Sequence, residues 1–246
     1  MIIRRELRPS SLITEGEIAQ LLGVSRTPVR EAFQRLAYDE LLILKPGRRP
    51  QIEPITLSKI EEAYPLIAVL EGLAIRLACR RLTESDLQHM EELTADMERC
   101  GRRGDTESLM VADNGFHAVL HERAENMRLH RVVTDLRRRL QRLEYVFFSA
   151  PEAVKGSVKR HRWLVKVLRK RNPREAQKAL EYIWGVGQES VQRLVEQYQL
   201  ASAEPGEFAD AVAEAAERSL PKGGQRLGVS VRPMGNRSGV YSRSSR

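Results

Sequence analysis

The sequence of 246 residues predicts a mainly α-helical protein in three parts. Between residues 58 and 199, apolar residues recur with a helical period, caps and breakers separate the segments, and no strand pattern occurs. Before residue 56, Gly and Pro divide the chain into shorter elements that suit two helices and a β-hairpin. After Pro221, Gly, Ser and Arg dominate, a composition typical of disorder. We therefore expect an N-terminal domain over 1–56, an all-α bundle over 57–200 and a flexible basic tail over 201–246.

Two short amphipathic helices are expected to meet at Gly23. Thr14 suits the N-cap of the first helix, with Glu17 three residues later completing a capping box, and Ser25 suits the N-cap of the second. Gly23 can adopt the positive φ of a tight turn between them. Two helices joined in this way form a helix-turn-helix. The expected apolar faces comprise Ile18, Ala19, Leu21 and Leu22 in the first helix and Val29, Ala32, Phe33 and Leu36 in the second.

The second of these helices begins with a polar edge formed by Ser25, Arg26, Thr27 and Arg30. In a helix-turn-helix, the first turn of the recognition helix meets base edges and phosphates in the major groove. Arginine binds guanine edges and phosphates, and serine and threonine hydroxyls add further hydrogen bonds. The pattern therefore predicts a DNA-binding module.

A β-hairpin is expected directly after the recognition helix. Residues 41–44 form an apolar run suited to a strand, and residues 51–53 can return as a second strand. The turn between them carries Gly47, Arg48 and Arg49, which suit contacts with phosphate or the minor groove. A solvated basic loop is the alternative, but the order of helix, turn, helix and basic hairpin favours a wing.

Six helices are expected in the bundle, and a marginal seventh over 208–220 in the tail. Pro65 should kink the first bundle helix or mark its true start. Gly101 and Gly104 should end the second helix, and Pro151 should separate the fourth from the fifth. The expected ranges are roughly 61–82, 83–100, 105–126, 127–148, 152–171 and 174–199.

The composition excludes several classes of protein. Hydrophobic residues make up 41% of the chain, enough for a packed core, but no apolar run approaches the ~18 residues of a membrane helix and no signal peptide is evident. We therefore expect a cytoplasmic protein, in which Cys79 and Cys100 are reduced. The net charge is +8, but six of the basic residues lie in residues 220–246, which contain no acid. The local placement of arginines, rather than the total charge, thus indicates nucleic-acid binding.

A second site is expected inside the bundle. Asp113 and His117 lie four residues apart on one helix, so they share a face and could hold one metal ion, which His161 could join from a later helix. His121, one turn further along, could replace a ligand. Alternatively, these groups bind an organic ligand without metal, or form a buried Asp–His pair. Trp184 is expected in the pocket wall or core, as is Trp163, and the basic run Arg137, Arg138, Arg139 and Arg142 is expected to form a solvated helix face.

The ten residues from Gly23 to Ala32, GVSRTPVREA, are similar to the signature of the GntR-type bacterial repressors. The resemblance implies that Arg26 and Arg30 contact the operator and that Gly47 approaches the minor groove. Two departures are visible. Gly16 stands where the family often has a third DNA-contacting arginine. The N-terminus also leaves no room for the extra first helix that the family usually has, which a truncated gene start would explain.

Residues 58–200 resemble the effector-binding FCD domain of the FadR subgroup, through the run Asp113 to His117, DNGFH, and Asn126. The resemblance implies that Asp113, His117 and His161 bind a divalent metal of the Zn, Ni or Mn type. The family's fourth ligand, 22 residues after the last of these, is replaced by Ile183. Ile67 stands where the family often has an arginine, four residues before the glutamate matching Glu71, so an acidic effector loses one anchoring cation.

The sequence therefore predicts a ligand-responsive repressor that acts as a homodimer on a palindromic operator in double-stranded DNA. A small metabolite bound near Asp113, His117, His161 and Trp184 would lower operator affinity. The alternative is a metal-dependent enzyme built on the bundle. Against that alternative, the sequence shows no convincing general base, phosphate-binding loop or nucleophile pattern, so we do not expect an enzyme.

Overall fold

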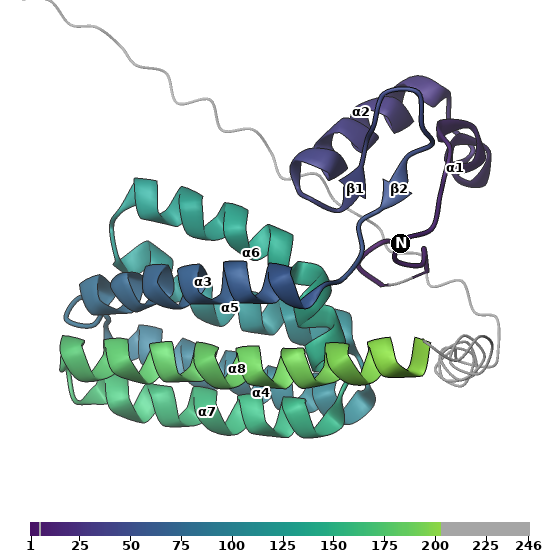
Figure 1. The fold of residues 1–246 in the computed structure, drawn as a ribbon. Coiled ribbons are helices and arrows are strands. Elements are labelled where there is room, and N and C mark those ends of the chain that lie inside the picture. Colours follow the sequence, from purple (N-terminus) through teal and green to yellow (C-terminus); the bar gives the residue numbers. More distant parts are fainter. Residues whose placement is uncertain (5, 203–246) are drawn as a thin grey trace, which may run out of the picture. The chain divides into compact units, whose positions relative to one another are not determined.

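A computed structural model describes residues 1–4 and 6–202 of the chain. Within them the protein is mainly helical, as predicted, with one small antiparallel sheet (Figure 1). The expected tail and its marginal helix over 208–220 lie outside the described residues. The elements in chain order are α1 Glu15–Leu22, α2 Arg26–Tyr38, β1 Leu42–Ile43, β2 Gln51–Ile52, α3 Leu57–Ala78, α4 Glu84–Arg103, α5 Thr106–Arg123, α6 Met127–Phe148, α7 Pro151–Arg169 and α8 Pro173–Ser202.

The predicted helix-turn-helix and hairpin are present in residues 11–53. Gly23 ends α1 with φ 67°, a left-handed conformation that favours glycine. The strands pair antiparallel with Leu42 opposite Ile52, and Leu12 adds a bridge to Gln51. A small apolar core holds the elements together, and its buried members are Ile2, Ile13, Ile18, Ala19, Val29, Phe33, Leu41, Leu42 and Ile52.

Three expectations about these short helices were wrong. Leu21 and Leu22 are 62% and 55% exposed, because Ile18 and Ala19 alone supply the buried face of α1. Ala32 is also exposed, so Val29 and Phe33 carry the buried face of α2. Ser25 occupies the N-cap position of α2, but its side chain makes no capping hydrogen bond. Thr14, in contrast, accepts a hydrogen bond from the Glu17 amide, as a cap should.

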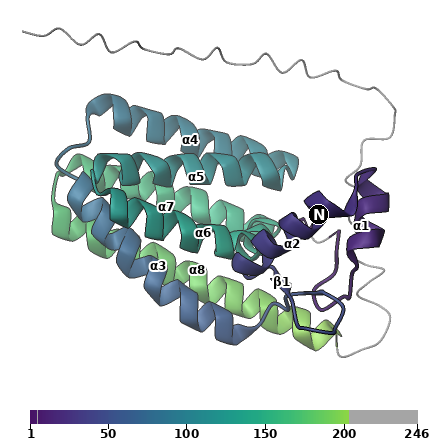
Figure 2. The same ribbon diagram turned by 90° about the horizontal axis from the view of Figure 1, so that it is seen from above.

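Residues 57–202 form the six expected bundle helices, whose axes run nearly side by side (Figure 2). The most extensive packing joins α3 to α8 and α4 to both α5 and α7. The helices share a second, larger apolar core that includes Ile60, Met90, Phe116, Leu140 and Leu164. No helix in the described residues is long and apolar enough to cross a bilayer.

Two helix boundaries in the bundle differ from the expected ones. Helix α3 begins at Leu57, capped by Thr56, and Pro65 lies inside it instead of marking its start. Helix α4 continues through Gly101 and ends at Gly104. Gly101 is needed for packing, because an added Cβ would lie 2.4 Å from Cγ1 of Val154 on α7.

Candidate functional site

The polar edge predicted at the start of α2 is open to solvent. Ser25, Arg26, Thr27 and Arg30 are all exposed, whereas Val29, on the opposite side of the turn, is buried. Because Ser25 makes no capping bond, its hydroxyl is available to an external partner. The structure therefore brings the four predicted residues together on one exposed helix end.

Two acidic residues of α1 hold arginines of this surface. Glu15 accepts from Arg30 Nε at 3.0 Å and from Arg30 Nη2 at 3.0 Å, and Glu17 accepts from Arg49 Nη2 at 3.0 Å. The hydrogen bond with Arg30 lowers the pKa of Glu15, so the carboxylate stays charged at neutral pH. Exposed ion pairs of this kind are weak, so phosphates can replace the carboxylates at little cost.

Gly16, the departure from the family signature, lies beside Arg26. A Cβ placed on Gly16 would lie 3.4 Å from Nη2 of Arg26, which is an ordinary van der Waals contact. The wing tip is exposed at Gly47, Arg48 and Arg49, and Gly47 has φ 68°.

The predicted Asp–His–His group is assembled inside the bundle. Asp113 and His117 on α5 and His161 on α7 each point one ligand atom at a common centre, and these atoms lie within 4.8 Å of one another. His161 Nε2 is 3.3 Å from Asp113 Oδ1, and His117 Nε2 is 3.9 Å from Asp113 Oδ2. All three side chains are buried.

Each imidazole makes a hydrogen bond through Nδ1, the nitrogen that faces away from Asp113, and this bond determines which ring nitrogen carries the proton. His161 Nδ1 donates to the Ser157 carbonyl oxygen at 2.9 Å, and His117 Nδ1 donates to Glu71 Oε2 at 2.9 Å. Burial, the largest influence, lowers the pKa of His117, which favours its neutral form. The Nε2 atoms of neutral rings then carry lone pairs aimed at Asp113, and His161 Nε2 has no hydrogen-bond partner. Such a donor set, oriented by outer hydrogen bonds, fits a divalent metal ion.

The other proposed ligand positions do not join this group. Ile183 lines the adjoining cavity, where its apolar side chain cannot coordinate a metal. His121 faces Glu71 instead, with Nε2 at 3.2 Å from Oε1. Within the described residues, the metal-binding group therefore contains three protein ligands.

Arg137 contacts the Asp–His–His group, although the sequence interpretation placed it elsewhere. It was expected on a solvated face, but it is buried and donates to Asp113 Oδ2 at 2.9 Å and Glu71 Oε1 at 3.2 Å. Its Nη2 also lies 3.4 Å from Glu144 Oε1. The helical period offered a signal, because Arg137 and Glu144 fall on the same stripe of α6 as the buried Val133 and Leu140. Arg142 is likewise buried.

A small cavity of about 50 Å³ adjoins the Asp–His–His group. Trp184 lies in its wall, as predicted, with its ring 5.8 Å from that of Tyr64 and 5.5 Å from the Arg137 guanidinium carbon. Trp163 is elsewhere and 42% exposed, contrary to expectation. The lining residues are Tyr64, Asp113, His117, Glu144, Phe147, Phe148, Ser157, Arg160, His161, Ile183, Trp184 and Gly187.

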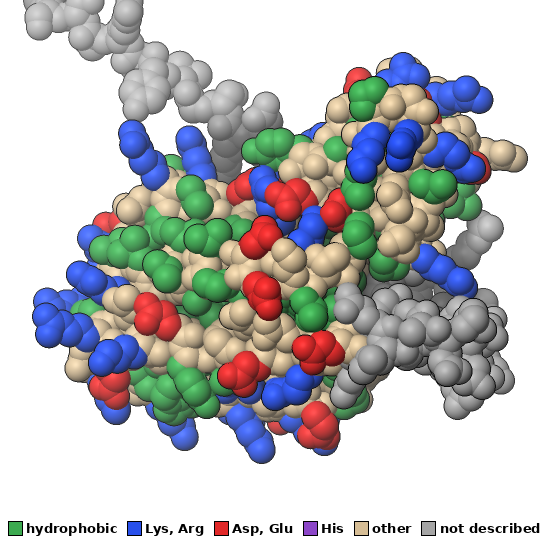
Figure 3. All heavy atoms as spheres, in the orientation of Figure 1, with side chains coloured by type: hydrophobic (Ala, Val, Ile, Leu, Met, Phe, Trp, Pro, Cys, Tyr) green, Lys and Arg blue, Asp and Glu red, His purple; other side chains and the backbone are tan. Residues whose placement is uncertain are grey.

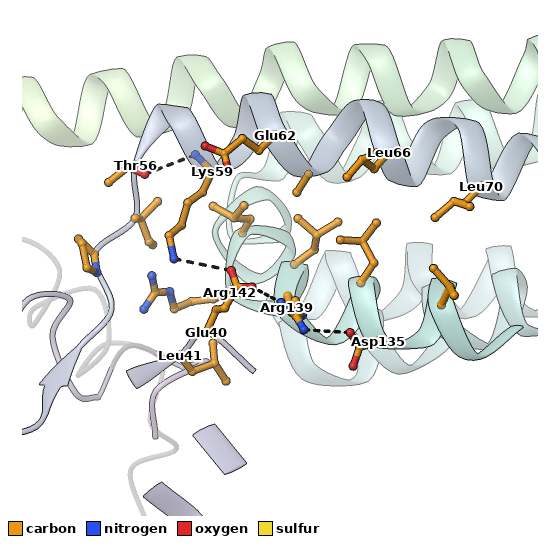
Figure 4. A pocket seen from close by; sticks show the side chains of 17 residues that line it. Glu40, Leu41, Thr56, Lys59, Glu62, Leu66, Leu70, Asp135, Arg139 and Arg142 are labelled. Carbon is orange, nitrogen blue, oxygen red and sulfur yellow. Dashed lines mark hydrogen bonds and ion pairs between the residues drawn. The ribbon is translucent and has the colours of Figure 1, made fainter. Parts of the chain in front are cut away.

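A larger hollow of about 420 Å³ lies between α3 and α6 and includes Glu40 and Leu41 (Figure 4). Leu66 and Leu70 of α3 face it, and ion pairs of Glu40 with Lys59 and Arg139 cross its end. It is mostly apolar and contains none of the Asp–His–His residues. Because convergent polar groups mark a specific ligand site, the smaller cavity is the better candidate.

Comparisons with known proteins agree with this organisation. The family described as "Bacterial regulatory proteins, gntR family" matches residues 1–52, and the family described as "FCD domain" matches residues 62–185. The Nta operon transcriptional regulator of Aminobacter aminovorans is 30% identical over 141 residues, which cover 57% of this chain and 67% of that protein. The HTH-type transcriptional repressor RspR of Escherichia coli strain K12 is 23% identical over 184 residues, covering 73% and 81%.

Solved structures share the fold. Escherichia coli McbR/YncC has a TM-score of 0.66 and 23% identity, covering 80% of this chain and 92% of that one. The family matches confirm both resemblances predicted from the sequence. The chain belongs to the GntR family of bacterial regulatory proteins and carries an FCD domain, so it is a transcriptional regulator and not an enzyme.

Proposed function

We propose that this regulator is a repressor in which residues 1–56 bind operator DNA and residues 57–200 bind a small effector. The observation that carries the proposal is the pairing of an exposed arginine edge on α2 with a separate, buried polar site in the bundle. An exposed edge suits a macromolecular partner, and a buried site suits a small molecule. We also propose that the protein is cytoplasmic, because its proposed partner is operator DNA.

The DNA contacts are assigned by exposure and charge. Arg26, Thr27 and Arg30, together with Ser25, would enter the major groove. Arg48 and Arg49, next to Gly47, would contact the backbone or minor groove. On binding, Arg30 would exchange its hydrogen bonds with Glu15 for contacts with DNA.

The test is the affinity of Arg30→Ala for DNA from upstream of the protein's own gene. Loss of a base-contacting arginine should weaken binding roughly 10- to 100-fold and relax sequence preference. Arg35→Ala, which removes an equal charge from the last turn of α2, is the matched control and should retain most of the affinity. Unchanged binding by Arg30→Ala in a shift assay would exclude α2 as the recognition helix.

A divalent metal of the Zn, Ni or Mn type is proposed at Asp113, His117 and His161. The metal would supply a Lewis-acidic centre to which an effector oxygen could bind in an open coordination position. The support is the convergence of three buried ligand atoms and the outer hydrogen bonds to Glu71 and Ser157.

A homodimer is proposed through an apolar stripe on α3. Leu66, Val69 and Leu73 are 59%, 62% and 38% exposed and lie on one helix face, and Val132 of α6 is 52% exposed. Figure 3 shows hydrophobic side chains gathered over these two helices. Exposed apolar patches of this kind mark protein interfaces. Val69→Glu should then be monomeric in sedimentation experiments, whereas Val111→Glu, at an equally exposed valine of α5, should not change the assembly.

A further inference from the structure

Two aromatic side chains meet on the surface of the bundle, and neither lines one of the two hollows described above. Trp163 of α7 is 42% exposed and Tyr182 of α8 is 60% exposed. Their ring centroids lie 6.0 Å apart and their planes meet at 83°, so the edge of one ring faces the other. Tryptophan and tyrosine are large apolar groups, and they are among the residues that most often dominate protein interfaces. The pair therefore marks a surface that can bind another molecule.

Three lysines surround the aromatic pair. Lys159 and Lys166 lie one turn before and one turn after Trp163 on α7, and Lys178 lies one turn before Tyr182 on α8. All three lysines are exposed, and within the described residues none of them forms an ion pair. Figure 3 shows hydrophobic side chains on α7 and α8 with Lys and Arg side chains around them. We call these five residues the aromatic–lysine patch.

Several other charges on these two helices are compensated within the protein. Arg162 Nη2 lies 2.8 Å from Glu98 Oε2, and Lys170 Nζ lies 2.6 Å from Glu175 Oε1. Glu189 is an exposed acid on the same face of α8, but it lies two turns beyond the aromatic pair. The patch therefore presents an apolar centre with unpaired positive charge around it. A complementary partner combines apolar groups with negative charge.

A glycine beside the patch leaves the backbone of α8 uncovered. Gly185 is exposed and lies three residues after Tyr182, on the same helix face. A Cβ on Gly185 would meet nothing within 4 Å, so the packing of this chain does not require glycine there. Glycine is less favourable than alanine in the interior of an exposed helix. The uncovered backbone at this point suits the close approach of another chain.

We propose that the aromatic–lysine patch docks an acidic protein segment that carries apolar side chains. Trp163 and Tyr182 contact the apolar side chains of this segment, and the three lysines pair with its carboxylates. A nucleic acid would match the positive charge equally well, but bases stack on open ring faces. In this pair the edge of one ring covers a face of the other, which favours a protein partner. The patch is separate from the proposed DNA and effector sites, so it adds a third partner to the regulator.

The test begins with the selection of random peptides displayed on phage against the full-length protein. The selected peptides should combine Asp or Glu with Leu, Phe or Trp. In anisotropy titrations of labelled synthetic copies, Trp163→Ala should weaken binding about 10-fold or more, as expected for an aromatic hot spot. Lys159→Glu, at an exposed position where folding is not at risk, should weaken the acidic peptides but not copies in which Gln and Asn replace the acids. Lys155→Glu, which changes a lysine of α7 paired with Glu152, is the matched control and should bind as the wild type does.

Gly185→Ala separates a binding role from a structural one. This variant should raise the melting temperature of the free protein, because alanine favours the helix, and yet weaken peptide binding, because the added methyl group stands in the contact. A variant that binds the peptides as tightly as the wild type would contradict the docked arrangement.

Three further results would overturn the proposal. The first is a selection that yields no peptides or peptides without acids. The second is equal binding of the selected peptides by the wild type, Trp163→Ala and Lys159→Glu. The third is a labelled single-stranded oligothymidine that loses more affinity than the peptides do in Trp163→Ala, which would make the patch a nucleic-acid site.

Discussion

The guanidinium of Arg137 pairs with the buried carboxylates of Glu71, Asp113 and Glu144, and these pairs influence the charge of the proposed ligand site. Burial raises the pKa of Asp113, but its interactions with His161, His117 and Arg137 outweigh this effect and hold the pKa well below its usual value. Glu144 behaves differently: burial raises its pKa to about 7, and the charge of Arg137 only partly offsets this. Near neutral pH, Asp113 is therefore ionised, whereas Glu144 is partly protonated.

Substitution of Glu144 should reveal its raised pKa. The folded side chain keeps its proton up to about pH 7, whereas the unfolded one loses it near 4.5. The folded state therefore binds the extra proton between these values, and the stability from this group falls as pH rises. Relative to Glu144→Gln, the wild type should lose thermal stability between pH 5 and pH 8 in a chelating buffer. A melting-temperature difference that does not change with pH would contradict the assignment.

A second prediction at the scale of single residues concerns the metal content of the protein. Purified wild-type protein should contain about one equivalent of divalent metal per chain, and Asp113→Ala should contain none, because only two protein ligands, His117 and His161, remain in the variant. Chelation should lower the melting temperature of the wild type only. His89→Ala, at an exposed histidine outside the group, is the control. Elemental analysis that finds no metal in the wild type would exclude the site.

The site could be predicted from the sequence only in part. Asp113 and His117 were visible because helical spacing places them on one face, and His161 was added by the family resemblance. The role of Arg137 was not visible, because a run of four arginines is normally a solvated face. The carboxylates that compensate it, such as Glu71 on α3, are distant in sequence and meet it only in the folded bundle.

Helix α6 contacts both the proposed ligand site and the segment that follows the recognition helix. One face carries Arg137, with Glu144 two turns later, at the site. On another face, Arg138 Nε lies 2.9 Å from Asp39, and Arg139 forms an ion pair with Glu40. Asp39 and Glu40 directly follow the recognition helix. A shift of α6 on ligand binding would therefore displace the segment that follows α2.

Replacing Arg139 tests this coupling. Arg139→Gln should leave operator binding and ligand binding each nearly intact when measured alone, but it should reduce the factor by which ligand changes operator affinity. Arg131→Gln, at an exposed arginine two turns earlier on α6, is the matched control. Titrating operator DNA with and without ligand gives the factor for each variant, and an unaltered factor in Arg139→Gln would exclude this ion pair from the coupling.

The elements themselves were largely predictable, because caps and helical periods are local signals. Thr83 and Asn126 cap α4 and α6 at the starts that the sequence pattern indicated. Gly101 misled the prediction, because tertiary packing overrides local propensity. Gly101 reads as a helix end in sequence, yet its role is the close approach of Val154.

At the scale of the whole molecule, the chain separates recognition of DNA from recognition of a small molecule. The apolar side chains form two distinct clusters, one around α1, α2 and the hairpin and one within α3–α8. Ligand binding to the second can alter DNA affinity only if the ligand binds DNA-free and DNA-bound protein unequally. By linkage, operator DNA must then weaken ligand binding by the same factor.

The most direct measurement is therefore the operator affinity of the full-length protein in the absence and presence of a ligand identified by thermal stabilisation. The account predicts sequence-specific binding to the upstream DNA, weakened by saturating ligand by about 5- to 150-fold, with an equal loss of ligand affinity in the operator complex. Specific DNA binding that no stabilising ligand alters, or ligand binding without any specific DNA binding, would contradict it.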